Sequence, residues 1–252
     1  MTNKLRYFIG NWKMFGDVSS FKIIHSINQF SRSSKNKFKN KIILCVPNTL
    51  IYFFKKKIKS KHVSLGAQNC HHYKGNGPFT GCVNASMLKK VGSEFIILGH
   101  SENRFSGESN QLIKKKIESA LAEKLNIIFC IGETLSEKRK LRTFVALKKQ
   151  ITGSMEKKFN LSKIIFAYEP VWSIGTNKVP KTSELKNNII FIKNELKKFF
   201  NTKKTPKVLY GGSVNDKNIR LFSSVSEIDG FLIGGASQSS KKFIDIVKNY
   251  YK

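Results

Sequence analysis

One acidic residue stands where a predicted strand meets a glycine-containing loop. Glu169 follows the apolar run 164–168 and precedes Pro170, which disfavours helical backbone angles for the residue before it. The carboxylate is therefore expected at the end of a strand, facing whatever the following loop covers. Such a group suits general-base catalysis. Taken by itself, the same pattern also fits an ordinary exposed loop acid.

Two polar side chains near the start of the chain could share a pocket with it. Asn11 and Lys13 alternate with Trp12, so they lie on one face if the first strand continues through them. Lys13 would then bring a fixed positive charge into the pocket. On the alternative reading, Lys13 is one more surface lysine in a lysine-rich chain.

A histidine occupies a comparable place in the middle of the chain. His100 follows the apolar run 95–98, and Ser101 and Glu102 after it begin a predicted helix. The start of a helix disfavours a positively charged imidazole. A neutral imidazole can donate a hydrogen bond to a carbonyl group and exchange protons with an enediolate, which an isolated core histidine would not do.

Glycine pairs end the last two apolar runs. Gly211 and Gly212 precede Ser213, and Gly234 and Gly235 close the final run. Bare backbone amides can approach a ligand closely, and several amides aimed at one point bind an anion. A single glycine pair is usually only a turn, but two pairs at consecutive final strands indicate a phosphate site.

Eight short apolar runs alternate with longer polar or amphipathic stretches, which predicts parallel strands joined by helices. Eight such units in 252 residues favour one (β/α)8 barrel domain spanning 1–252, with a doubly wound open sheet as the structural alternative. Because the polar residues above follow the carboxyl ends of the strands, they should converge on one pocket. The runs are 5–9, 42–46, 63–67, 95–98, 127–131, 164–168, 208–210 and 230–233.

The chain is strongly basic, with 46 Lys and Arg against 16 Asp and Glu and a formal net charge of +30. Such a field attracts polyanions, which raises nucleic acid as a partner. The basic residues recur along the whole chain, however, as expected for solvated outer faces or a coding bias. In one helix, Ile113, Ile117 and Leu121 form the apolar stripe and 114–116, all lysine, should face solvent. We therefore expect no specific nucleic-acid binding.

The four cysteines, Cys45, Cys70, Cys82 and Cys130, form no C-x-x-C pair and fit reduced thiols. Cys70 and Cys82 with the neighbouring histidines 71 and 72 invite a metal-site reading. We reject it because adjacent histidines point apart in an extended backbone and the spacing fits no zinc pattern. No apolar run is long enough to span a membrane, and we expect a cytoplasmic protein.

Six segments together closely resemble the triosephosphate isomerase family. The resemblance is ordered, extends from residue 3 to about residue 240 and includes every predicted strand end. A different phosphate-binding barrel enzyme, or a basic binding protein on a barrel scaffold, should lack this complete set. The segments are 11–14, 99–102, 130–134, 167–172, 210–214 and 229–237.

The resemblance implies interconversion of dihydroxyacetone phosphate and D-glyceraldehyde 3-phosphate in glycolysis and gluconeogenesis, without metal or organic cofactor. Glu169 would be the base, and neutral His100 would polarise the carbonyl group and shuttle protons. Asn11 and Lys13 would stabilise developing negative charge, and Glu102, with Ser101 beside it, would support the site by orienting Lys13. This family is itself a well-known example of such tuned acid–base chemistry.

The resemblance also assigns the substrate phosphate to backbone amides of Gly175, Ser213, Gly234 and Gly235, and a lid to residues 170–180. Within that lid the chain departs from the family pattern. Asn177 replaces a usual glycine, and asparagine tolerates the left-handed backbone.

Finally, the resemblance implies a homodimer in which the loop from Gly75 to Cys82 enters the partner. The family usually has Glu where this chain has Cys82, and Arg where it has Asn103. These positions can pair across the dimer interface, so one ion pair is missing. Because an exposed ion pair contributes little, a dimer is still expected.

Overall fold

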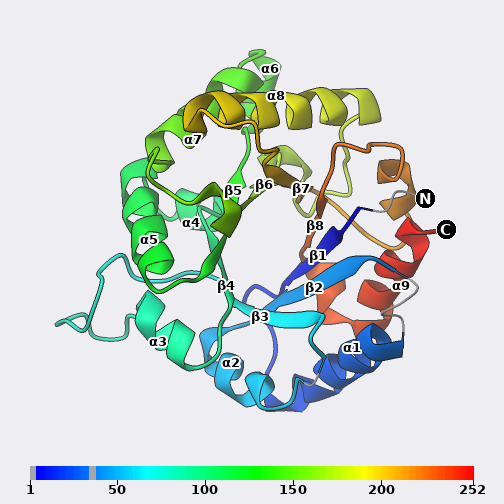
Figure 1. The fold of residues 1–252 in the computed structure, drawn as a ribbon. Helices are drawn as coiled ribbons and strands as arrows, with labels where there is room; N and C mark the ends of the chain where they lie inside the picture. Colours follow the sequence, from blue (N-terminus) through cyan, green and yellow to red (C-terminus); the bar gives the residue numbers. More distant parts are fainter. Residues whose placement is uncertain (1–3, 34–37, 59) are drawn as a thin grey trace.

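Eight parallel strands close into a barrel in the computed structural model, which describes residues 4–33, 38–58 and 60–252 (Figure 1). Each strand pairs with the next, and β8 pairs back onto β1. The predicted (β/α)8 barrel is thus confirmed, and the doubly wound sheet is wrong. The strands are β1 Arg6–Asn11, β2 Asn40–Cys45, β3 Val63–Ala67, β4 Phe95–Leu98, β5 Asn126–Ile131, β6 Ile164–Tyr168, β7 Lys207–Tyr210 and β8 Gly230–Ile233. Every predicted run overlaps its strand, and the ends differ by at most two residues.

Helices surround the barrel as an outer ring (Figure 1). They are α1 Phe21–Ser33, α2 Asn48–Lys55, α3 Ala85–Lys90, α4 Ser101–Phe105, α5 Asn110–Ala122, α6 Leu135–Arg139, α7 Thr143–Ser154, α8 Thr182–Phe200 and α9 Ser240–Tyr250. Short 3₁₀ helices are η1 Val18–Ser20, η2 Leu161–Lys163, η3 Val171–Ser173, η4 Ile219–Phe222 and η5 Gly235–Gln238. The structure describes every residue of the connection from β7 to β8, which contains η4 in place of an α-helix.

The strands bury both of their faces, which explains their nearly continuous apolar sequences. Side chains such as Ile9, Ile43 and Leu209 fill the inside of the barrel. Their neighbours in sequence, such as Phe8 and Leu44, point outward against the helices and belong to the larger of two buried clusters. The alternation follows from the two-residue period of a strand. The barrel is therefore a packed core and leaves space for ligands only at its ends.

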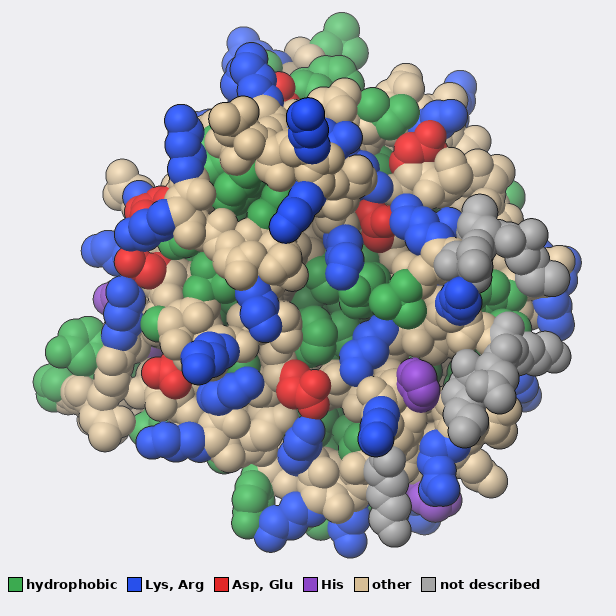
Figure 2. All heavy atoms as spheres, viewed as in Figure 1, with side chains coloured by type: hydrophobic (Ala, Val, Ile, Leu, Met, Phe, Trp, Pro, Cys, Tyr) green, Lys and Arg blue, Asp and Glu red, His purple; other side chains and the backbone are tan. Residues whose placement is uncertain are grey.

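Lysine and arginine side chains are spread over the face shown in Figure 2, with few carboxylates between them. The expectation that all of 114–116 face solvent is wrong for one residue. Lys116 is 7% exposed, forms an ion pair with Glu108 and donates to Asn69 Oδ1 at 3.0 Å. It lies three residues after Ile113 and directly before Ile117, so it shares the buried stripe of α5. Its ion pair offsets the cost of removing its charge from water.

The loop after β3 differs from expectation at its histidines. The rings of His71 and His72 lie with centroids 4.4 Å apart, so the two side chains do not point apart. Over the described residues, no three His, Cys, Asp or Glu side chains are grouped to hold a metal ion. All four cysteines are free thiols, of which Cys82 is exposed. Burial raises the pKa of the Cys70 thiol to about 12.

Within the same described residues, none of the helices combines the length and apolar character needed to cross a membrane.

The seam that closes the barrel requires a glycine. Gly230, the first residue of β8, has φ +157° and pairs with Tyr7 of β1. A Cβ atom built at Gly230 would overlap the backbone nitrogen and carbonyl group of Tyr7. Neither strand can move away without breaking the hydrogen-bonded ladder. Only glycine permits this close approach of the two backbones.

We therefore predict that Gly230→Ala lowers the free energy of unfolding by about 3 kcal/mol, because the added methyl group clashes with backbone atoms that cannot shift. Equilibrium unfolding in urea, followed by circular dichroism, measures this change. Lys198→Ala, at an exposed position of α8 and away from the loop 75–82, is the control. Equal stabilities for the two variants would contradict the prediction.

Candidate active site

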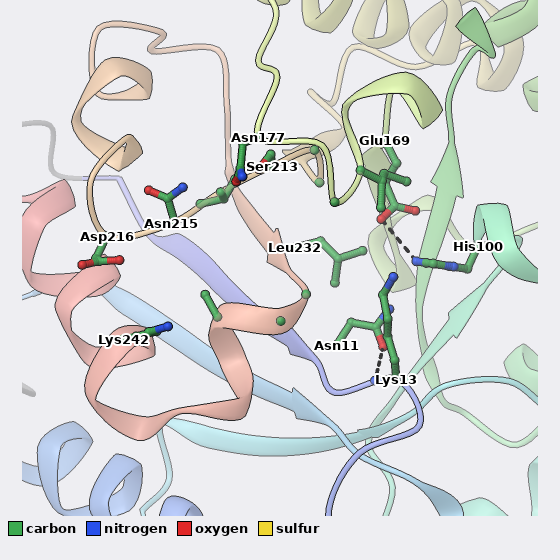
Figure 3. A pocket seen from close by; sticks show the side chains of 18 residues that line it. Asn11, Lys13, His100, Glu169, Asn177, Ser213, Asn215, Asp216, Leu232 and Lys242 are labelled. Carbon is green, nitrogen blue, oxygen red and sulfur yellow. Dashed lines mark hydrogen bonds and ion pairs between the residues drawn. The ribbon is translucent and has the colours of Figure 1, made fainter.

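A cavity of about 330 Å³ opens at the carboxyl ends of the strands (Figure 3). It brings together eight residues singled out in the sequence as catalytic or substrate-binding candidates. They come from the ends of β1, β4, β6, β7 and β8 and from the loop after β6. These residues are Asn11, Lys13, His100, Glu169, Gly175, Ser213, Gly234 and Gly235.

Glu169 directly follows β6, and its backbone N–H donates to Ile131 O at 2.8 Å. The position depends on Gly132, because a Cβ atom there would overlap the carbonyl oxygen of Glu169. The carboxylate is only 4% exposed. Within the described part of the chain, its Oε2 atom has no hydrogen-bond partner. A buried carboxylate oxygen without a donor is available to accept a proton from a ligand.

His100 faces Glu169 across the cavity, with Nε2 3.6 Å from Glu169 Oε1 (Figure 3). It caps α4, and its Nδ1 accepts a hydrogen bond from the backbone N–H of Glu102 at 3.3 Å. Glu102 Oε2 lies 3.5 Å from the same nitrogen, but this carboxylate is already paired with Lys13. With Nδ1 accepting this bond, Nε2 is the ring nitrogen that can donate to a ligand, and it faces Glu169.

Lys13 reaches the cavity by a different backbone route from the one expected. The first strand ends at Asn11, and Lys13 adopts a left-handed backbone with φ 55°. Asn11 Oδ1 holds this turn by accepting from Lys13 N at 3.1 Å. Continued strand alternation through Lys13 is therefore wrong, although both side chains line the cavity. A non-glycine residue held in this region is characteristic of a constrained functional site.

Glu102 contacts Lys13 from outside the cavity, with its Oε1 2.5 Å from Lys13 Nζ. Partial burial opposes ionisation, yet the hydrogen bond from Lys13 holds the pKa of the Glu102 carboxyl below its usual value. The pair fixes the position of the ammonium group. Ser101 lies on the other side, in a separate cavity of about 250 Å³ behind Glu169.

Backbone amides gather at the other end of the cavity. The N–H of Gly235 opens η5 and therefore has no helical carbonyl to bond. Gly175 has a left-handed backbone, with φ 70°. The amide of Ser213 donates to Ser173 Oγ at 3.2 Å. The amides of Gly175, Gly234 and Gly235, joined by that of Ser213 when it exchanges Ser173 Oγ for a ligand, form a set that can bind an oxyanion.

The loop over the cavity begins with η3 and is tied down by the hydroxyl of Ser173. This hydroxyl donates to Lys178 O at 2.5 Å and lies 3.1 Å from the hydroxyl of Tyr210 at the end of β7. One side chain thus connects the loop, the barrel and the Ser213 amide. Asn177 has φ 59°, which confirms the expected left-handed backbone at this position.

Sequence reasoning missed several residues that line the cavity. Asn215 and Asp216 lie two and three residues after Ser213, so their position after β7 was a usable signal. Lys242, in the first turn of α9, had been assigned to a solvated outer face. The sequence held no signal for its actual place.

The arrangement combines four chemical features in one cavity. A buried carboxylate can accept a proton, and a neutral imidazole can donate a hydrogen bond nearby. A fixed ammonium group stabilises negative charge, and free amides bind an oxyanion some distance away. This combination suits proton transfer next to the carbonyl group of a small phosphorylated molecule.

The sequence is similar throughout its length to known triosephosphate isomerases. The family model for triosephosphate isomerase matches residues 6–250. The triosephosphate isomerase of Alkaliphilus metalliredigens is 37% identical over 243 residues, which cover 94% of this chain and 96% of the relative. That of Dictyoglomus thermophilum is 38% identical over 247 residues, with 95% and 97% covered.

The structure gives the same result. The crystal structure of triosephosphate isomerase from Bartonella henselae superimposes with a TM-score of 0.88 at 32% sequence identity, and the match covers 98% of this chain and 99% of that chain. Sequence, fold and the contents of the cavity agree, and the chain belongs to the triosephosphate isomerase family.

Proposed function

We propose a mechanism by which this chain interconverts dihydroxyacetone phosphate and D-glyceraldehyde 3-phosphate, the reaction of its family. The substrate phosphate binds to the amides of Gly175, Ser213, Gly234 and Gly235. This places the carbonyl end of the substrate between Glu169 and His100, which lie at the other end of the cavity (Figure 3). In this proposal the whole chain, 1–252, acts as one barrel domain.

Glu169 removes the proton next to the carbonyl group and returns it to the neighbouring carbon. The Nε2 proton of His100 donates to the carbonyl oxygen and is exchanged between the two oxygens of the enediolate. Lys13 and Asn11 stabilise the negative charge that develops there. Every step uses side chains that already line the cavity.

The free Oε2 atom of buried Glu169 is the observation that supports this assignment best. The structural carboxylate of Glu108 also has one oxygen without a partner, but its other oxygen is paired with Lys116. For Glu169, the nearest cationic or imidazole nitrogen is His100 Nε2, which lies 3.6 Å from Oε1 and so beyond hydrogen-bond distance. A different phosphate-binding barrel enzyme would need the amides that bind phosphate, but it would not need Glu169 and His100 together.

We predict that Glu169→Gln lowers kcat roughly 10³-fold, because the amide keeps the shape of the side chain but cannot accept the proton. A coupled assay of glyceraldehyde 3-phosphate isomerisation measures the rate. Glu123→Gln, at the end of α5 and outside the cavity, is the matched control. A Glu169→Gln variant as active as this control would rule out Glu169 as the base.

The lid of the proposed enzyme, residues 170–180, rests on a buried carboxylate. Glu133 Oε1 accepts from Trp172 Nε1 at 2.8 Å, and the hydroxyl of Tyr168 donates to the same carboxylate at 3.1 Å. Burial raises the pKa of the Glu133 carboxyl, although the hydrogen bond from Trp172 opposes the shift. The charge of one residue thus supports both the end of β6 and the lid.

This raised pKa predicts a pH dependence. Folding takes up protons between the unfolded value of about 4.5 and the higher folded value, so the stability contributed by Glu133 falls as pH rises through that interval. The variant Glu133→Gln lacks this titration and keeps an acceptor for Trp172. The wild type should therefore lose stability relative to the variant as pH rises above 4.5, as measured by urea unfolding. A constant difference across pH would disprove the raised pKa.

We further propose that the enzyme is a cytoplasmic homodimer of glycolysis and gluconeogenesis. The loop from Gly75 to Cys82 projects away from the barrel after β3 (Figure 1). It carries Phe79, which is 38% exposed, and the exposed thiol of Cys82. Burial of an exposed aromatic ring against a second copy supplies the apolar contact that an isologous interface needs.

The dimer proposal predicts that the wild type sediments with twice the mass of one chain at micromolar concentration. Phe79→Asp should sediment as a single chain, because a carboxylate would be buried at the interface. Leu221→Asp, an equally drastic change at an exposed residue of η4, should remain dimeric. Dilution of the wild type should also speed modification of Cys82. A wild type that sediments only as monomer would refute the proposal.

A further inference from the structure

The cavity has two cationic side chains among its described lining residues, at opposite ends. Lys13 lies beside Glu169 and His100, and Lys242 lies at the far end with Asn215 and Asp216 (Figure 3). Gly175, Ser213, Gly234 and Gly235, whose amides suit a phosphate, line the same cavity. A phosphate bound to those amides would therefore share the cavity with Lys242.

The two lysines differ in how their charge is used. Lys13 is paired with Glu102 at 2.5 Å. Among the described residues, no carboxylate oxygen lies within 4.0 Å of Lys242 Nζ. Likewise, no lysine or arginine nitrogen of these residues lies within 4.0 Å of the Asp216 carboxylate. The charge of Lys242 thus remains available to an incoming anion.

The position of Lys242 is unfavourable for its own helix. It lies in the first turn of α9, where its backbone N–H donates to the capping Ser239 Oγ at 3.4 Å. A cation in the first turn opposes the helix dipole. No acidic residue occupies that turn to compensate. Lys241 lies in the same turn and bears the same cost, so only the cavity distinguishes the two lysines.

The fold holds Lys242 at the rim of the cavity. The buried residues Phe243, Ile246 and Val247 fix α9 against the barrel. Neighbouring helix positions point about 100° apart, so Lys241 faces elsewhere and does not line the cavity. Lys241 and Lys242 carry the same charge and are both exposed, so they differ in orientation alone.

We propose that Lys242 is a phosphate-capture residue, whose ammonium group supplies a second positive charge to the dianionic phosphate of the substrate. It draws the dianion to the glycine amides and strengthens its binding, while Asp216 beside it opposes this attraction. The inference rests on the proposed isomerase function of the same cavity. It concerns substrate binding and leaves the proton-transfer steps to Glu169 and His100.

The test compares wild type, Lys242→Gln, Lys241→Gln and Asp216→Asn in the glyceraldehyde 3-phosphate assay, at ionic strengths from about 0.01 M to about 0.3 M. Inorganic phosphate serves as the second ligand, with its dissociation constant measured by calorimetry. Lys242→Gln should raise KM and the phosphate dissociation constant roughly two- to five-fold at low salt. Its kcat should stay unchanged. The difference should shrink at high salt, because mobile ions screen the charge.

The other two variants distinguish a specific effect from a general loss of positive charge. Lys241→Gln removes the same charge one residue away and should shift both constants much less. Asp216→Asn should shift them in the opposite direction, which structural damage would not do. Equal effects of Lys242→Gln and Lys241→Gln would overturn the inference while leaving the isomerase intact. An inactive wild type that still binds inorganic phosphate would instead overturn the proposed function.

Discussion

Closure of the parallel ladder is the constraint on which the rest of this structure depends. Once β8 pairs with β1, all strands end at the same rim, and residues distant in sequence, such as Lys13, His100 and Glu169, meet in one cavity. The closure depends on backbone contacts that exclude any side chain, at Gly230 on the seam and at Gly132 beside Glu169. The positions of the reactive groups are therefore set by main-chain hydrogen bonds, which are less adaptable than side-chain packing.

The charge of the molecule is organised differently inside and outside this ladder. At the amino end of the barrel, Asp229 accepts from Val208 N at 2.8 Å and pairs with Lys193 at 2.7 Å. Glu108 forms a similar buried ion pair with Lys116. These two carboxylates thus neutralise lysines that are buried, while others pair with exposed lysines such as Lys158. The excess positive charge stays on the surface, where water and salt screen it.

The sequence predicted the strands well because each is apolar on both faces and ends at a polar or glycine residue. It also predicted which of these ends line the cavity, since types such as Glu before Pro and paired glycines have local physical meaning. It could not predict the left-handed turn at Lys13, which depends on the side chain of Asn11. Nor could it predict the burial of Lys116 or the place of Lys242, because these depend on how separate elements pack.

The amide of Ser213 donates to Ser173 Oγ, the hydroxyl that connects the loop after β6 to Tyr210 of β7. In the proposed cycle, a bound phosphate takes this donor away from the lid. Binding is then an exchange of acceptors and gains less free energy than contact with an unoccupied amide would give. When the phosphate leaves, the amide can bond to this hydroxyl again, which offsets part of the free energy lost on release. Catalysts that turn over rapidly need such weak retention of product as much as they need a strong base.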